Sequence, residues 1–125
     1  MTSAQVLSLC MCFSGLDNRK QMLQISQFLR GISIPQGKEI CREGSEPRDW
    51  YVLLRGTASV MIRSEDGGPP VELNTLSVGA SIGEFAIMYR CPRSATVVAG
   101  AGGCVVGALS IEDYDRLLKR HHMEV

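Results

Sequence analysis

The chain has 125 residues, the size of one ordinary domain, so we expect a single domain over residues 1–125 without a second catalytic lobe. Thirteen basic side chains balance thirteen acidic ones, and this neutrality argues against a nucleic-acid surface, which usually carries a basic excess. The composition, 45% hydrophobic and 21% charged, is typical of a globular protein, and no apolar run approaches the roughly 18 residues that span a bilayer.

The cysteines indicate a reducing compartment. There are five, an odd and scattered set, whereas a secreted domain held by disulfides favours an even number at closer spacing. Cys10 and Cys12 do not have a zinc-binding spacing, and no second Cys or His cluster completes a site. Residues 1–16 lack the positive start and the cleavage site of a signal peptide. We therefore expect a cytoplasmic protein with reduced cysteines and no metal.

The N-terminal part is predicted to be helical. Residues 1–31 form this segment, in two pieces that cover 4–12 and 17–30. Apolar side chains recur at helical spacing in the second piece, and Gly31 follows at a position that suits a helix end.

Residues 32–110 are predicted to form short β-strands, because alternating or apolar runs are separated by turn residues. Arg55 and Gly56 are expected to end one strand, and residues 100–103 to be a flexible turn between the last two strands. Short strands at regular intervals, bracketed by helices, indicate a mainly β fold: a small antiparallel β-roll or jelly-roll barrel. The predicted strands cover residues 32–34, 40–42, 50–54, 58–62, 71–76, 94–99 and 104–109.

A closing helix is predicted over residues 111–121. Ser110 offers an N-cap, and basic residues follow near the end of the helix, where they complement its dipole. The apolar face of this helix comprises Ile111, Tyr114, Leu117 and Leu118.

Segment 82–97 (IGEFAIMYRCPRSATV) carries the most informative chemistry. Residues 85–89 make one apolar helical turn, too short to stand alone as a helix. The free backbone N–H groups at the start of such a turn favour an anion, and Gly83 has no side chain to block its approach. Glu84 can accept hydrogen bonds from hydroxyl groups, and Arg93 offers a planar fork for two phosphate oxygens. These residues together describe a pocket for an anionic sugar phosphate.

This segment resembles the phosphate-binding cassette of cyclic-nucleotide-binding domains, and above all the cassettes of the regulatory subunits of cAMP-dependent protein kinase. That family places Gly-Glu before an apolar turn with a small residue, and later Pro-Arg, a small residue, Ala and Ser or Thr. Here the two parts read Gly83-Glu84-Phe85-Ala86 and Pro92-Arg93-Ser94-Ala95-Thr96. Upstream glycines agree in register, so the resemblance covers roughly residues 13–118.

The resemblance implies a role for each cassette residue. Arg93 would pair with the exocyclic oxygens of the cyclic phosphate, and Glu84 would accept from the ribose 2′-hydroxyl. Gly83 would allow the close approach of the ligand, and the Ser94 hydroxyl would add a phosphate or base contact. Backbone N–H groups near four residues would complete the phosphate site: Phe85, Ala86, Ser94 and Ala95.

The function that follows is a non-catalytic regulatory module. It would bind cAMP, with cGMP as the second choice, need no cofactor, and switch a protein effector in cis or in trans. In this family a longer C-terminal helix covers the base; because the chain ends at Val125, we expect that cover to be short or to lie outside this sequence. One alternative is an interaction domain of the same fold with little or no nucleotide affinity. Another is a sugar-binding or metal-dependent enzyme on a similar barrel, although no metal ligands or paired acid and base are visible.

Some single residues have plainer interpretations. Arg93 could be a surface arginine in a loop, or could form a structural salt bridge with Glu84. Ser94 could simply be a small residue that fits a crowded loop. Three apolar residues of the short helix are expected in the core rather than against a base: Phe85, Ile87 and Met88.

Overall fold

The structure, a computed structural model, describes residues 25–119. The helix predicted over 4–12 and most of the piece predicted over 17–30 therefore lie outside the described residues. Residues 25–28 form a helical turn, after which the chain enters a strand at Arg30. The predicted helix end at residue 30 was thus too late, because this residue already pairs with Ala108 across a β-ladder.

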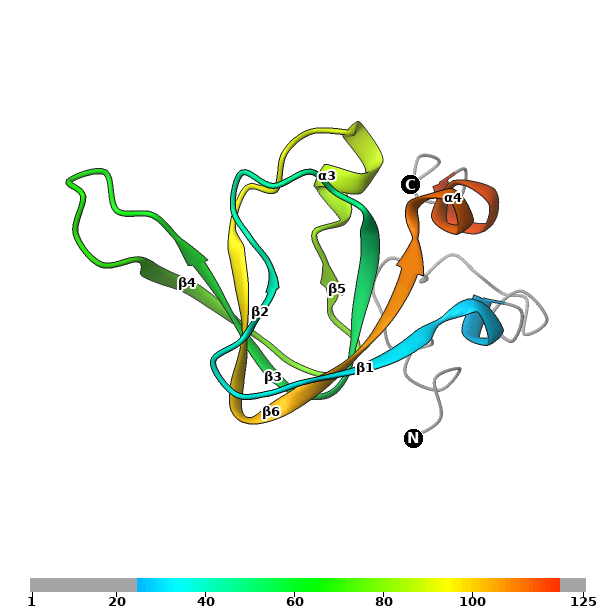
Figure 1. Cartoon of the computed structure of the whole chain (residues 1–125), viewed down its shortest axis with the longest axis horizontal. Coiled ribbons are helices and arrows are strands. Elements are labelled where there is room, and N and C mark those ends of the chain that lie inside the picture. Colours follow the sequence, from blue (N-terminus) through cyan, green and yellow to red (C-terminus); the bar gives the residue numbers. More distant parts are fainter. Residues whose placement is uncertain (1–24, 120–125) are drawn as a thin grey trace.

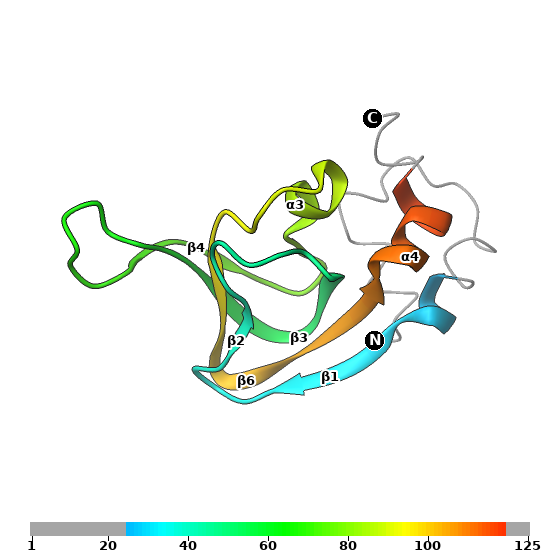
Figure 2. The same cartoon turned by 45° about the horizontal axis from the view of Figure 1, so that its top comes forward.

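The architecture is an antiparallel β-roll, as predicted, with its helices at one end (Figures 1 and 2). The six strands form one sheet in the order β1-β6-β3-β4, in which β2 pairs with β6 and β5 pairs with β3. The strands are β1 (Arg30–Ile34), β2 (Glu39–Cys41), β3 (Asp49–Ile62), β4 (Val71–Leu76), β5 (Ser81–Ile82) and β6 (Thr96–Ser110). The helices are α3 (Glu84–Tyr89), α4 (Ile111–Tyr114) and the π-helical turn η2 (Asp115–Lys119).

Two strands are longer than predicted, because β3 and β6 bend without ending. The prediction that Arg55 and Gly56 end a strand was wrong, since β3 continues through them to Ile62. Residues 100–103 likewise belong to β6 and are not a separate turn. The register between the two strands shifts near these points, and such bulges let a strand bend sharply while its ladder continues. The bends allow the same two strands to line both halves of the roll.

Two clusters of buried side chains hold the fold together. One lies beneath the helices and comprises Ile25, Trp50, Val52, Ile87, Leu109 and Tyr114. The other fills the roll and comprises Ile40, Leu53, Ala58, Ile82, Val97, Ala99, Cys104 and Val106. Ile82 and Ile87, which lie on either side of the start of α3, thus belong to different clusters. Burial in both clusters fixes this short helix against the roll.

Several predicted details of the core are confirmed. Trp50 is fully buried, and its indole N–H donates to the Ser81 hydroxyl at 2.7 Å. The Ser110 hydroxyl caps α4 by accepting from the Asp113 N–H at 3.2 Å, and Tyr114 of that helix is fully buried. Within residues 25–119 there is no helix with both the length and the apolar character that crossing a membrane requires.

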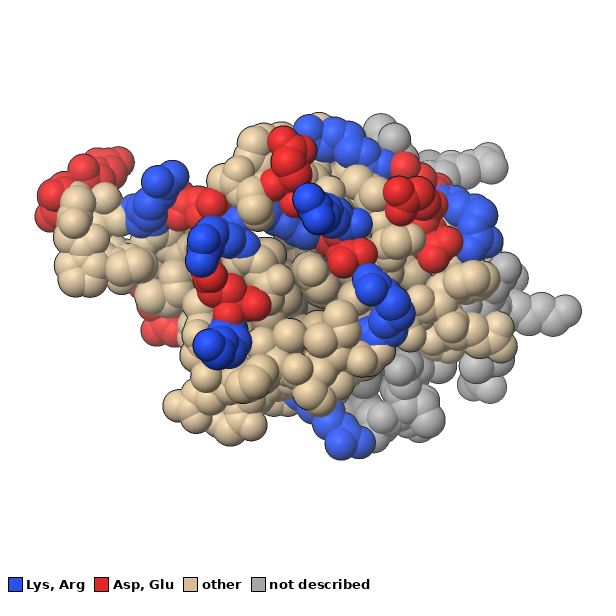
Figure 3. All heavy atoms as spheres, viewed as in Figure 1, with Lys and Arg blue, Asp and Glu red and all other residues tan. Residues whose placement is uncertain are grey.

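On the face seen in Figure 3, positive and negative side chains lie interspersed. Exposed ion pairs of this kind contribute little stability, about 0–1 kcal/mol each, so the core clusters carry most of it. The pairs are Arg30–Asp49, Arg42–Glu39, Arg63–Glu43, Arg90–Asp115 and Arg116–Asp113.

The burial of Ile87 predicts a large stability difference between two truncations. Ile87→Ala should lower the free energy of unfolding by about 2–5 kcal/mol, because it leaves a cavity where α3 meets the core. Leu73→Ala, at a side chain that is 59% exposed, should change it by no more than about 0.5 kcal/mol. Urea unfolding of both variants measures this, and equal losses would contradict the core assignment.

Candidate functional site

The site is built around α3, a helix of six residues that follows the end of β5. Gly83 begins it in the left-handed conformation with φ of 71°, and Arg90 ends it in the same region with φ of 54°. The predicted helical turn over residues 85–89 is thereby confirmed. After α3 the chain passes Pro92 and returns to the roll as β6, so both ends of the connection lie on the sheet (Figure 2).

Arg93 is the central residue of this connection, and it is buried, with only 4% of its surface exposed. Its Nη1 donates to the Gly83 carbonyl at 2.9 Å, and its Nη2 donates to the Asp49 carbonyl at 2.5 Å. The guanidinium carbon also lies 5.8 Å from the centre of the Tyr51 ring. The interpretation of Arg93 as a surface arginine was therefore wrong.

The main chain of Arg93 is held as firmly as its side chain. Its N–H donates to the Ser45 carbonyl at 2.9 Å, and its carbonyl accepts from the Gly44 N–H at 2.7 Å. These bonds join the cassette to the turn between β2 and β3. A buried guanidinium with fixed orientation and N–H groups left over is suited to an anion with two oxygens.

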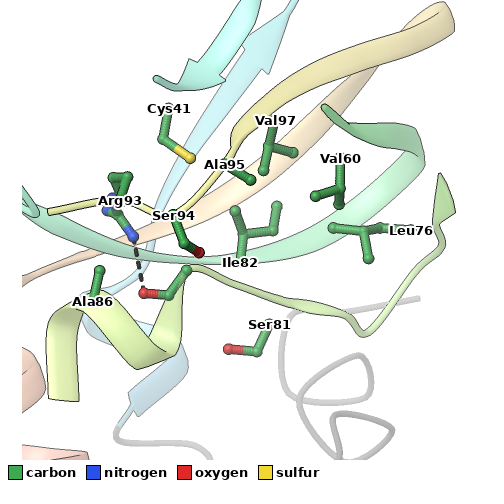
Figure 4. Close-up of a pocket in the computed structure, with 11 residues that line it drawn as sticks. Cys41, Val60, Leu76, Ser81, Ile82, Ala86, Arg93, Ser94, Ala95 and Val97 are labelled. Atoms are coloured by element: carbon green, nitrogen blue, oxygen red, sulfur yellow. Dashed lines mark hydrogen bonds between the residues drawn. The ribbon is translucent and has the colours of Figure 1, made fainter. Parts of the chain in front are cut away.

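A cavity of about 160 Å³ lies beside this guanidinium (Figure 4). Arg93 is the only charged residue among the described side chains that line it, and most of the others are apolar or small. A positive charge in such a setting is weakly screened by solvent and therefore attracts an anion strongly. The lining residues are Cys41, Val60, Leu76, Ser81, Ile82, Gly83, Ala86, Arg93, Ser94, Ala95 and Val97.

Five of the seven predicted site residues line this cavity: Gly83, Ala86, Arg93, Ser94 and Ala95. Ser94 is exposed to solvent. The other two, Glu84 and Phe85, lie in the first turn of α3, and their side chains are outside what the structure describes.

Sequence reasoning missed the apolar walls, which come from strands: Cys41 of β2, Val60 of β3, Leu76 of β4 and Val97 of β6. It also missed the Asp49 carbonyl that orients Arg93. The alternation of apolar and polar residues along the strands could have indicated which side chains form the walls. A backbone carbonyl, in contrast, is present in every residue, so the sequence does not show which one accepts a hydrogen bond.

The environment of the cavity changes the acidity of two groups. Burial raises the pKa of the Cys41 thiol, although the nearby positive charge of Arg93 acts in the opposite direction. Burial also raises the pKa of the Tyr51 hydroxyl, and the negative charge of Asp49 adds to the effect. Both shifts favour the neutral form, so neither group offsets the positive charge of Arg93. No cluster of three or more potential metal ligands occurs in the part of the chain that the structure describes.

The far end of α3 contacts the closing helix through Arg90. Its guanidinium donates to the Ile87 carbonyl in the last turn of α3 and pairs with Asp115 at the start of η2. The Arg90 N–H donates to the Ala86 carbonyl and so ends the helix. Arg90 thus joins the end of α3 to the start of η2.

Fold and site define a class of protein: an antiparallel β-roll in which a short helix and a buried arginine close a small cavity. A sequence model described as the cyclic nucleotide-binding domain matches residues 32–121. The chain therefore belongs to the cyclic nucleotide-binding domain family, and the resemblance seen in its sequence is confirmed.

Curated relatives include regulatory subunits of cAMP-dependent protein kinase. The subunit of Hypocrea atroviridis is 34% identical over 113 residues, which cover 85% of this chain and 24% of the relative. That of Blastocladiella emersonii is 35% identical over 109 residues, covering 87% of this chain and 26% of the relative. The chain thus spans about a quarter of the length of these relatives.

Solved structures share the fold. The regulatory domain of Toxoplasma gondii PKA with cAMP superposes with a TM-score of 0.86 at 24% identity, covering 98% of this chain and 46% of that one. The regulatory subunit of a cAMP-independent protein kinase A from Trypanosoma brucei gives a TM-score of 0.85 at 26% identity, covering 98% and 44%. A variant of that subunit, in which one of three substitutions replaces threonine with arginine, was solved with cAMP in its A site.

The crowding at Gly83 predicts the outcome of a matched pair of substitutions. A Cβ at this position would collide with the Arg93 guanidinium, in addition to the strain of a side chain at positive φ. Gly37 has a similar φ of 82° but open space around it. Gly37→Ala should therefore cost about 1–2 kcal/mol for the backbone conformation alone, and Gly83→Ala should cost more because Arg93 must also move.

The free energies of unfolding of the two variants, compared in urea, test this. Equal losses would mean that Arg93 does not occupy the space next to Gly83.

Proposed function

We propose that the chain is a non-catalytic cyclic-nucleotide sensor that binds cAMP, in preference to cGMP, through its ribose and cyclic phosphate. The observation that carries the proposal is the buried guanidinium of Arg93, held by the Gly83 and Asp49 carbonyls beside a cavity with no other charged lining among its described side chains. A cation that is oriented before binding loses little entropy when the anion arrives, which favours affinity.

The size of the cavity supports binding of the sugar phosphate rather than burial of a whole nucleotide. Sites for drug-sized ligands typically measure about 300–1,000 Å³, whereas this cavity measures about 160 Å³. The phosphate and ribose would fill it, with Arg93 on the exocyclic oxygens and Glu84 accepting from the 2′-hydroxyl. The base would then lie toward the exposed Ser94.

The preference for cAMP is supported by relatives that are named for dependence on cAMP, at 34% and 35% identity. The variant of the Trypanosoma brucei subunit that was solved with cAMP also carries an introduced arginine.

Switching would follow from differential binding of two conformations of the cassette. A phosphate bound to the remaining N–H groups of Arg93 would also act on the Gly83 carbonyl that accepts from the same guanidinium, and would so shift the start of α3. That shift would reach η2 through the Arg90–Asp115 pair and the buried Ile87. A protein effector in cis or in trans that contacts the closing helix would then sense the ligand.

Titration of cAMP, cGMP and adenosine monophosphate by calorimetry tests the proposal. Saturable binding of cAMP is expected, weaker binding of cGMP, and the weakest binding of the open monophosphate. Arg93→Lys keeps the charge but loses the planar pair of donors, so it should lower the affinity for cAMP by at least about tenfold. Glu84→Ala should lower it by a similar factor, because a charge-assisted hydrogen bond contributes about 1.5–3 kcal/mol. Arg63→Lys, at an exposed ion pair with Glu43, serves as the control and should bind normally.

Each outcome separates the hypotheses. No saturable binding of any cyclic nucleotide below millimolar concentration would overturn the proposal in favour of an interaction domain without nucleotide affinity. The observation that favours this alternative is the relative at 26% identity, which is described as the regulatory subunit of a cAMP-independent protein kinase A. Normal affinity in a folded Arg93→Lys variant would overturn the residue assignment even if cAMP bound.

A further inference from the structure

A second concave surface is lined by the end of β1 and by the bends of β3 and β6. These bends lie at the lower edge of Figure 1, away from α3 and α4. The concave surface has a volume of about 540 Å³, and it is more open to solvent than the cassette cavity. We refer to it as the bend groove. Its lining residues are Ser33, Ile34, Pro35, Arg55, Gly56, Ala101, Gly102, Gly103, Cys104 and Val105.

The floor of the bend groove consists of closely packed backbone without side chains. A Cβ on Gly56 would lie 2.5 Å from the Gly103 carbonyl oxygen, so no side chain fits where β3 and β6 cross. The apolar residues of the lining are Ile34, Pro35, Ala101 and Val105. Val105 lies directly opposite Arg55 across the ladder and so shares its face, whereas Ile34 lies opposite Cys104 and packs against the core of the roll. The hollow is thus a consequence of how the two long strands bend.

Among the residues that the structure describes, Arg55 is the only charged one that lines the bend groove. Its guanidinium has no hydrogen bond or ion pair with another residue in the range 25–119. Arg48 is the only other described arginine of which this is true. No acidic side chain between residues 25 and 119 is part of this lining. An exposed cation beside apolar walls, with its charge uncompensated, is complementary to a carboxylate that neighbours an apolar group.

We propose that the bend groove binds an extended acidic and apolar peptide segment of a partner protein. A carboxylate of the segment pairs with Arg55, and the neighbouring apolar side chain lies against Pro35 and Val105. A peptide fits better than a small molecule, because small ligands are usually buried by about 70–90% and this groove leaves one side open. The site is separate from the cassette, so it does not depend on the proposed nucleotide function.

A short acidic peptide tests the proposal directly. The probe is acetyl-Gly-Asp-Leu-Val-Gly-amide, and its matched control carries Lys in place of Asp. Titration into the ¹⁵N-labelled full chain, with and without saturating cAMP, is followed by the amide signals. We expect saturable shifts at residues 101–105 and at Arg55 with the acidic peptide only, and the same shifts whether or not cAMP is present.

Three variants sharpen the test. Arg55→Gln removes the charge and should lower the affinity for the acidic peptide by about three- to tenfold. Ala101→Glu places a carboxylate at an exposed position of the groove and should weaken it at least as much. Arg48→Gln, at the other described arginine without a side-chain partner, should leave binding unchanged.

Equal shifts with the lysine peptide, shifts confined to other surfaces, or unchanged binding in Arg55→Gln would overturn the proposal. So would shifts of the groove amides that depend on protein concentration without peptide, because they would show that a second copy of the chain occupies the groove. The cassette amides report cAMP binding in the same samples. A failure of the nucleotide proposal is therefore distinguishable from a failure at the groove.

Discussion

The structure of the site depends on one buried cation. Arg93 enters the interior between the roll and α3, where its guanidinium donates to the carbonyls of Gly83 and Asp49. Burial of a charge without partners is costly, and these two acceptors offset that cost without adding a negative charge. The positive charge thus remains available to a ligand. A carboxylate partner would have held the arginine as well, but it would have competed with any anion for the same N–H groups.

The fold supplies the rigidity that this arrangement needs. Ile82 and Ile87 anchor the beginning and the middle of the cassette in two different clusters of the core, and the main chain of Arg93 is bonded to the turn before β3. A helix of six residues would not persist alone. Held at both ends, it can nevertheless present Gly83 and Ala86 to the cavity. The Arg90–Asp115 pair extends the same connection to the closing helix.

The sequence was sufficient to predict the class of fold, the short cassette helix, the Ser110 cap and the buried Trp50, because each depends on local pattern or strong hydrophobicity. The continuity of β3 and β6 was missed, since Gly56 and residues 100–103 look like strand ends although they mark bends within paired strands. The cavity walls were missed because they depend on strand pairing across the roll. The orientation of Arg93 was missed because its acceptors are backbone carbonyls, which any residue provides.

The central claim is that Arg93 is oriented before the ligand arrives and then binds the cyclic phosphate. ¹⁵N-edited NMR of the arginine side chains tests it most directly. In the free domain, Arg93 should give a dispersed side-chain signal with slow hydrogen exchange, unlike the exposed Arg55, and saturating cAMP should shift that signal. An Arg93 signal at the position of a solvent-exposed arginine, or one that saturating cAMP leaves unchanged, would contradict the account.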